Sequence, residues 1–234
     1  MPRRQVEHRN TSEIVLAVDI PTLVVLARSH DGMIEFVPQV GDFVAADEPL
    51  FVLHGGAATI DDRALRSTVA FGPERTLEQD PMFAFRIIVD IGLKALSPAI
   101  NDPTTAVLAL DQVHRLLRMV GRRKLRGEVI LDDGGQPRLI FRTPNWEDYV
   151  HVACSEIRAC GADNLQIARR MRAMLENLRS TLPEHRRPAL EVQLDLLDSA
   201  VETHFTRPEE LALARIPDSQ GLGGSSGSRY RDSG

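Results

Sequence analysis

Three charged side chains recur at intervals of four residues inside an otherwise apolar segment. They are Arg86, Asp90 and Lys94. Residues four apart in a helix lie on one face, so the three charges must be neutralised by one another or by a neighbouring helix. Two kinds of chemistry fit this pattern. Asp90 can form an internal salt bridge with the two cations, or Arg86 and Lys94 can bind a small anion such as an anionic head group.

A second polar cluster follows in the stretch KALSPAINDPTTAV, residues 94–107. Pro98 ends one helix, and Asp102 is placed to cap the next. No capping rule requires Asn101, and the N–H groups at the start of the new helix can attract an anion. These observations suggest a site for a small anion or a metal ion formed by Arg86, Asp90, Lys94, Asn101 and Asp102. An alternative cluster for a hard cation comprises Glu78, Asp80 and Asp102, although helix capping explains both aspartates.

The sequence has no motif whose spacing carries chemistry on its own. It lacks a P-loop, a dinucleotide-binding glycine fingerprint, an HExxH zinc motif and a paired CxxC, and no GxSxG lies between a predicted strand and a predicted helix. His151 and Cys154, three residues apart in a predicted helix, can pair as base and thiolate, but no third orienting group is evident. We therefore predict no catalytic residue, no metal and no cofactor, and favour a protein that is not an enzyme. The minor alternative is an enzyme that uses the carboxylates of the stripe as acid and base.

A run of predicted helices positions the charged stripe and the polar cluster. Two Asp-Pro pairs each combine a capping side chain with a proline suited to the first turn, which predicts helices over about 81–96 and 103–121. Apolar residues surround the first of these helices almost completely, which predicts that it is buried in the centre of a bundle. Further helices are predicted from Asn145 onward, with the short links that are typical of antiparallel neighbours.

The first quarter of the chain has a different pattern. Residues 13–19 predict a strand, residues 20–29 a short helix, and the segments MIEFV and PLFVL two more strands. The stretch VPQVGDFVAADEPLFVL, residues 37–53, resembles the hammerhead turn of biotinyl and lipoyl carrier domains. A carrier needs a modifiable lysine on a tight hairpin, and no lysine precedes Lys94. The similarity is therefore one of local β geometry, and swinging-arm chemistry is excluded for this segment.

Together these elements predict an α+β fold that is predominantly α. A small N-terminal β-containing module is followed by an antiparallel helical bundle with one inserted β-hairpin, whose two apolar runs flank Asp-Asp-Gly-Gly. The predicted divisions are a basic N-terminal lead over residues 1–11, a small α/β module with the hammerhead-like turn over 12–56, the helical bundle over 57–216 with its hairpin near 128–143, and a disordered Gly/Ser-rich tail over 217–234.

Composition narrows the classes of partner. The chain has 28 Lys+Arg against 33 Asp+Glu, a net charge of -5 and a pI near 5.8, so no basic field is available to hold nucleic acid. The longest apolar run near the N-terminus, residues 14–27, contains Asp19 and Pro21 and is shorter than the roughly 20 residues needed to span a bilayer. Two cysteines, six residues apart in one predicted helix, are typical of reduced cytoplasmic thiols.

The segment RTLEQDPMFAFRIIVDIGLKALSPAINDPTTAVLALDQVHRLL, residues 75–117, resembles a bacterial family of predicted membrane proteins catalogued as domain of unknown function 2254. The shared features are an Arg-x-x-x-Gln-Asp start, an Asp-Ile helix ending in Ala-Leu-Ser-Pro, and an Asn-Asp-Pro-x-Thr-Ala turn. The pieces IVLAVDIPTLVVLA and VGDFV are also similar, so the resemblance covers roughly residues 12–210. Family members carry several transmembrane helices before a soluble half. The resemblance implies that this chain corresponds to that soluble C-terminal half, with the transmembrane part absent. It would then be a domain separated from its anchor, a shortened gene product or a stand-alone version.

The resemblance implies a location and an architecture, not a reaction. We expect a cytoplasmic domain, peripheral to or detached from the inner membrane, that acts with the membrane or with a membrane-embedded subunit. The basic segment MPRRQVEHR is typical of chain on the cytoplasmic side of a membrane helix. The leading hypothesis is a non-enzymatic interaction or regulatory role. The alternative is a sensor or transport-linked domain that binds a small anion or metal ion at the five residues named above. Self-association is left open.

Overall fold

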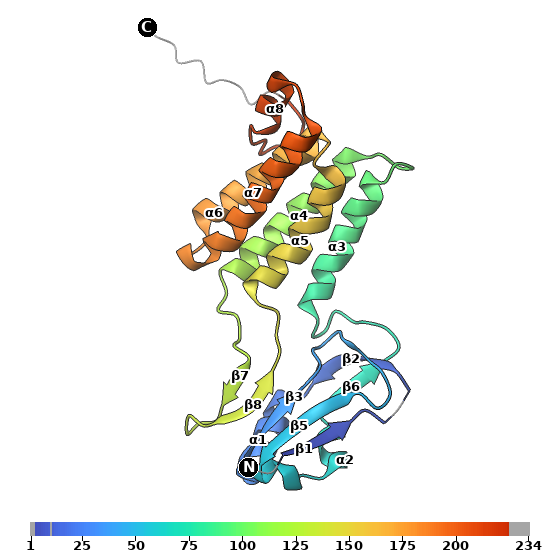
Figure 1. Cartoon of the computed structure of the whole chain (residues 1–234), viewed down its shortest axis with the longest axis vertical. Coiled ribbons are helices and arrows are strands. Elements are labelled where there is room, and N and C mark those ends of the chain that lie inside the picture. Colours follow the sequence, from blue (N-terminus) through green and yellow to red (C-terminus); the bar gives the residue numbers. More distant parts are fainter. Residues whose placement is uncertain (1–2, 10, 225–234) are drawn as a thin grey trace. The chain divides into compact units, whose positions relative to one another are not determined.

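A computed structural model describes residues 3–9 and 11–224 of the chain (Figure 1). Over these residues the chain divides into two compact units. Unit 1 contains the residues up to 84 together with 126–144, and unit 2 contains 85–125 together with the residues from 145 onward. The chain therefore passes between the two units three times. The fold is α+β and predominantly helical, which confirms the predicted class.

Unit 1 is built on a five-stranded sheet with the strand order β1-β5-β3-β8-β7. The β3–β8 pair is parallel and the other three pairs are antiparallel. In the parallel pair Ile34 lies opposite Leu139, and both side chains are fully buried, so this pairing runs through the core. The strand bounds are β1 Arg3–Glu7, β3 Gly32–Phe36, β5 Pro49–Gly55, β7 Val129–Leu131 and β8 Pro137–Phe141.

A three-stranded sheet with the order β4-β2-β6 completes the strands of unit 1. Directly after β2, the Asp19 side chain accepts a hydrogen bond from the Thr22 N–H and so caps helix α1. Leu23 and Ala27, four residues apart on α1, are fully buried against the core of this unit. The bounds are β2 Glu13–Val18, β4 Phe43–Val44, β6 Val69–Gly72 and α1 Ile20–Ser29.

The end of β5 passes very close to the loop that follows α1. Gly55 has φ +65° and ψ -136°, a conformation that is essentially restricted to glycine. A Cβ atom on Gly56 would lie 1.7 Å from the carbonyl oxygen of His30, and one on Gly32 would lie 2.1 Å from the backbone nitrogen of Ala57. Two backbones can approach this closely only without side chains. A 3-10 helix, η1 (Gly56–Thr59), and helix α2 (Asp62–Arg66) follow this crossing.

Unit 2 is a helical bundle in which α4 contacts α5 and α6, and α7 contacts the same two helices. The single tryptophan of the sequence, Trp146, is 1% exposed at the start of α5, and its Nε1 donates to the carbonyl oxygen of Arg186. Among the described residues, none of the helices combines the length and the hydropathy that crossing a bilayer requires. The bounds are α3 Pro81–Leu96, α4 Pro103–Gly121, α5 Trp146–Gly161, α6 Leu165–Thr181, η2 Glu184–Arg186, α7 Arg187–His204 and α8 Pro208–Ala214.

Helix α3 has the predicted bounds but not the predicted central position. Phe85 and Val89 are buried, whereas Ile87 is 38% exposed and Ile91 is 50% exposed. The prediction of burial on all sides is therefore wrong. An apolar pattern records which residue types occur around a helix, whereas burial depends on how many neighbouring helices cover it. Neighbouring residues cover one side of α3, and Ile87 and Ile91 lie on its exposed side.

Strand pairing joins segments that the predicted divisions place apart. The N-terminal lead contains β1, which pairs antiparallel with β5 from Arg3 opposite His54 to Glu7 opposite Pro49. The β-hairpin occurs near 128–143 as predicted, but it belongs to unit 1, because β8 pairs with β3. The hairpin is thus inserted in the sequence of the bundle without being part of it.

Two smaller segments also differ from their predictions. Residues 69–72, which fall within the predicted helical bundle, form strand β6 beside β2. The first part of the predicted disordered tail is ordered, because the Asp218 N–H donates to the carbonyl oxygen of Arg169, and Gln166 on α6 donates to the carbonyl oxygen of Gly221. Asp218 itself is 6% exposed and accepts bonds from three backbone N–H groups of the segment. The remainder of that predicted tail, 225–234, lies outside the described residues.

Candidate functional site

The charged stripe on α3 forms an ion-pair network, but with different members from those predicted. Arg86 donates to Asp90 through Nε at 2.8 Å and to Glu156 of α5 through Nη1 at 2.5 Å. These bonds, that to Asp90 first, hold the pKa of Arg86 above its ordinary value. Lys94 is exposed and has no ion-pair partner among the residues that the structure describes. Because two carboxylates occupy the Arg86 guanidinium, little of its charge is available to an external anion.

Ordinary turn mechanics account for Asn101 and Asp102. Asn101 has φ +48°, in the left-handed region that asparagine tolerates better than most residues, and its backbone N–H donates to the carbonyl oxygen of Ser97. Asp102 accepts from the Thr105 N–H at 3.1 Å and from the Thr105 hydroxyl at 2.6 Å, and that hydroxyl is the main reason for its lowered pKa. The ligand site proposed for these two residues and the stripe stays a prediction.

Metal and thiolate chemistry find little support in the geometry. No group of three or more potential metal-binding side chains occurs within residues 3–9 and 11–224. Asp80 caps α3 by accepting from the Phe83 N–H at 3.0 Å. The Nδ1 atom of His151 lies 3.1 Å from the Ser155 hydroxyl, whereas Cys154 is fully buried. Burial raises the pKa of the Cys154 thiol to about 12, which opposes the thiolate that the predicted pair requires.

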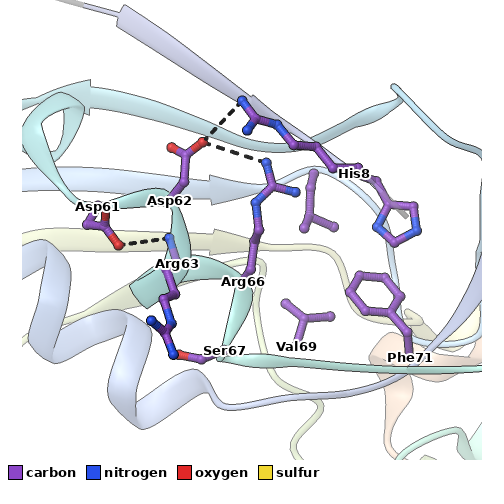
Figure 2. A pocket seen from close by; sticks show the side chains of 10 residues that line it. His8, Asp61, Asp62, Arg63, Arg66, Ser67, Val69 and Phe71 are labelled. Atoms are coloured by element: carbon purple, nitrogen blue, oxygen red, sulfur yellow. Dashed lines mark hydrogen bonds and ion pairs between the residues drawn. The ribbon is translucent and has the colours of Figure 1, made fainter. Parts of the chain in front are cut away.

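A pocket of about 630 Å³ lies in unit 1 beside α2 (Figure 2). Its residues come from three places: the segment after β1, the short helix α2 with its two capping residues, and strands β5 and β6. Figure 2 shows Asp62 and Arg66 along one side of the pocket and the rings of His8 and Phe71 on the other. The lining residues are His8, Arg9, Leu50, Asp61, Asp62, Arg63, Arg66, Ser67, Val69 and Phe71.

Arginines crowd around one carboxylate on the polar side of this pocket. Asp62 accepts a 2.5 Å hydrogen bond from Nη1 of Arg4, and nitrogens of Arg66 and Arg9 lie 3.6 Å and 3.9 Å from its Oδ2. Arg4 also donates to the carbonyl oxygen of Ile60. Burial pushes the pKa of Asp62 upward, but the Arg4 hydrogen bond and the surrounding guanidinium charges outweigh it and hold that pKa below its ordinary value. The Asp62 carboxylate is therefore ionised at neutral pH and holds the surrounding arginines by ion pairing.

The opposite side of the pocket is mainly apolar. The His8 ring is 2% exposed and lies against the Phe71 ring, with centroids 4.5 Å apart. Its Nε2 lies 3.1 Å from the carbonyl oxygen of Thr11 and 3.6 Å from a carboxylate oxygen of Glu13. Leu50 and Val69, both buried, complete this wall. The pocket thus offers guanidinium groups on one side and a ring and aliphatic surface on the other.

No motif in the sequence predicts this pocket. Arg4 and Arg9 lie more than fifty residues away from Arg63 and Arg66, and only the pairing of β1 with β5 brings the two groups together. The available signals were the two basic pairs, Arg3-Arg4 near the N-terminus and the arginines that flank Ala-Leu after Asp61-Asp62. Neither signal has a spacing that indicates a site.

A buried polar network between α4 and α6 was also not predicted. Arg170, 5% exposed, donates to Asp111 at 2.7 Å through Nε and approaches Nδ1 of His114 at 3.2 Å through Nη2. Because an arginine can only donate, Nδ1 must accept, so Nε2 carries the proton that His114 shares with Oδ1 of Asn177 at 3.0 Å. Burial is the largest cause of the lowered pKa of His114. The network joins α4 to α6 through side chains of both helices.

Comparison with known proteins supports the resemblance over most of the chain. The family described as predicted membrane protein (DUF2254) matches residues 2–177. Uncharacterized proteins of Mycobacterium bovis and of two strains of Mycobacterium tuberculosis are 30% identical to the chain over 204 residues. The alignment covers 84% of this chain and 39% of each relative, so the chain spans less than half the length of these relatives. No solved structure matches the chain.

Proposed function

Because the chain belongs to the DUF2254 family of predicted membrane proteins, we propose that it is a cytoplasmic interaction or regulatory domain that works beside a membrane. It contacts the bilayer or a membrane-embedded partner through one face of α3 and catalyses no reaction. The observation that carries this proposal is the pair of exposed isoleucines on that helix, Ile87 and Ile91. They lie four residues apart and therefore on the same face.

The composition of the α3 face suits a contact with a membrane component. Exposed apolar side chains one helical turn apart cost solvation free energy unless a partner covers them. The exposed Lys94, one turn beyond Ile91, adds a positive charge that is attracted by anionic lipid or by an acidic partner. Apolar anchors beside a cation are the usual arrangement of helices that lie against membranes or pack into apolar grooves.

A double substitution on α3 tests the proposal. We expect Ile87→Asp with Ile91→Asp to reduce several-fold the fraction of the chain that floats with membranes prepared from its own host, because two carboxylates would have to be desolvated at the contact. The matched control is Val192→Asp with Leu196→Asp on α7, whose side chains are 54% and 40% exposed at the same spacing. The control should float as the unsubstituted chain does. Equal flotation of the α3 variant and the unsubstituted chain would contradict the proposal.

The two cysteines provide a test of the cytoplasmic side, because both are free and only Cys160 is exposed. In spheroplasts, a membrane-impermeant maleimide should label neither thiol. After lysis it should label Cys160 alone, since Cys154 is buried and burial raises the pKa of its thiol to about 12, which opposes formation of the reactive thiolate. Denaturation should expose the second thiol, and Cys160→Ser should abolish the labelling of the folded chain. Labelling of Cys160 in intact spheroplasts would place the domain on the other side.

A further inference from the structure

We propose that the pocket beside α2 binds the phosphate group of a phosphomonoester, with the organic part of the ligand against the His8 and Phe71 rings. This inference goes beyond the proposed function and does not depend on it. The pocket lies in unit 1, and the α3 isoleucines that carry the proposed function lie in unit 2.

The pocket has an excess of positive charge. Arg9, Arg63 and Arg66 line its polar wall beside two carboxylates, those of Asp61 and Asp62, and Arg4 pairs with Asp62 from outside the lining. The Asp61 carboxylate already accepts hydrogen bonds from the backbone N–H groups of Arg63 and Ala64, at 2.9 and 3.2 Å. Four guanidinium groups against two carboxylates leave an excess of two positive charges. A phosphomonoester carries a charge of about -1.5 to -2 near neutral pH and so matches this excess.

Arg66 offers a hydrogen-bond donor that no described residue uses. Its Nη2 atom is buried and has no hydrogen-bond partner within residues 3–9 and 11–224. Its distance to the nearest oxygen of Asp62, 3.6 Å, allows ion pairing but is too long for a hydrogen bond. A buried N–H without an acceptor is unfavourable, and an oxygen of a ligand in the pocket would satisfy it. Arg66 therefore both lines the pocket and lacks an acceptor.

The directions from which the arginines approach favour a phosphate over a carboxylate. The guanidinium groups reach the polar wall from two separate segments, Arg4 and Arg9 from the N-terminal part and Arg63 and Arg66 from α2. A carboxylate offers two acceptor oxygens in one plane. A phosphate monoester offers three terminal oxygens in different directions, each able to accept charge-assisted bonds, and so suits donors that arrive from different sides.

The size and the apolar wall of the pocket favour a phosphomonoester over inorganic phosphate. A volume of about 630 Å³ lies within the range of pockets that hold small organic ligands and far exceeds what one phosphate fills. The wall opposite the arginines is formed by the His8 and Phe71 rings with Leu50 and Val69, and apolar surface of this kind gains free energy from covering a carbon skeleton. The ligand class is therefore a phosphate ester with an apolar or aromatic body.

Titration calorimetry on the full chain with phenyl phosphate, inorganic phosphate and phenol tests this assignment. We expect phenyl phosphate to bind more tightly than inorganic phosphate, and phenol not to bind at millimolar concentration. Arg66→Gln should weaken phenyl phosphate binding by about tenfold or more, the loss typical of one charge-assisted hydrogen bond. Arg9→Gln, at a side chain that is 74% exposed, should weaken binding by about threefold and spare the fold.

The matched control is Arg28→Gln, which removes a 53% exposed arginine of the same unit that pairs with Asp133 outside the pocket. This variant should bind phenyl phosphate as the unsubstituted chain does. Three results would overturn the proposal: no binding of either phosphate probe, unchanged binding in both Arg66→Gln and Arg9→Gln, or equal binding of phenol and phenyl phosphate. Circular dichroism of each variant shows whether it has folded, and Arg9→Gln keeps the test decisive if Arg66→Gln does not fold.

Two further arms of the same experiment identify the source of the phosphomonoester. Vesicles of phosphatidylcholine with phosphatidic acid present this group at a lipid surface, and glycerol phosphate presents it in solution. Recruitment to these vesicles, lost in Arg66→Gln and absent with phosphatidylcholine alone, supports a lipid head group. Binding of glycerol phosphate without recruitment supports a soluble metabolite. Failure of both, together with failure of phenyl phosphate, rejects the site while leaving the flotation test of α3 unaffected.

Discussion

Replacement of Asp111 by alanine is expected to lower the free energy of unfolding of unit 2 by about 3 kcal/mol. Asp111 accepts the bonds of Arg170 at 2.7 and 2.6 Å, and Arg170 is 5% exposed between α4 and α6. Without the carboxylate the buried guanidinium would lose its only ion-pair partner among the described residues. The Asp111 side chain is itself 34% exposed, so water can replace part of the interaction and the expected loss lies at the lower end for buried pairs.

Urea unfolding followed by the fluorescence of Trp146 measures this loss, because the single tryptophan is buried in unit 2. Glu156→Ala is the matched control. It also removes a carboxylate from an arginine, Arg86, but that pair lies at the surface, with Glu156 57% exposed, and should contribute less than about 1 kcal/mol. Equal losses in the two variants would show that burial does not distinguish the two ion pairs.

Gly56→Ala is expected to destabilise unit 1 by at least about 3 kcal/mol, or to prevent it from folding. The new Cβ atom would lie 1.7 Å from the carbonyl oxygen of His30, a backbone atom that no rotamer change can move. To relieve the clash, the end of β5 and the loop after α1 would have to move apart. Hydrogen exchange followed by mass spectrometry should then show faster exchange in the peptides that contain β3 and β5.

Gly127→Ala provides the control for this substitution, because no heavy atom lies within 4 Å of the position of its Cβ. Alanine there should leave the exchange of unit 1 unchanged or slightly slower, since it reduces the conformational entropy of the unfolded chain. Unchanged exchange of β3 and β5 in Gly56→Ala would show that the close crossing is not required for the fold.

Local signals predicted much of the secondary structure. The Asp-Pro pairs predicted the starts of α3 and α4, and Asp102 does cap α4. Segment 20–29 forms α1 as predicted, with Asp19 as its cap. Caps and helical periodicity depend on residues within one or two turns of each other, which is why a single sequence contains them.

The arrangement of strands depends on partners that are far apart in the sequence, and these pairings were not predicted. Nothing in the hairpin of residues 128–143 indicates that β8 pairs in parallel with β3, about a hundred residues earlier. Likewise, the alternation in Arg3–Glu7 is too short to predict β1 beside β5. The pocket beside α2 depends on that second pairing, so it could not be predicted without it. The Arg86–Asp90 pair, four residues apart on one helix, was within reach of local reasoning, whereas Glu156 was not.

The insertion of β7 and β8 between α4 and α5 has a consequence for how this protein can be divided or recombined. A gene fragment that ends after the codon for Ala84 would encode most of unit 1 but leave the edge of β3 without its parallel neighbour, with free N–H and C=O groups open to aggregation. A fragment that starts at Phe85 would contain the bundle and the β7–β8 hairpin, but the hairpin would lack its partner strand β3. Because each unit is made of two separate segments of the chain, no single continuous gene fragment encodes either unit completely. We therefore expect the two units to be inherited and expressed together.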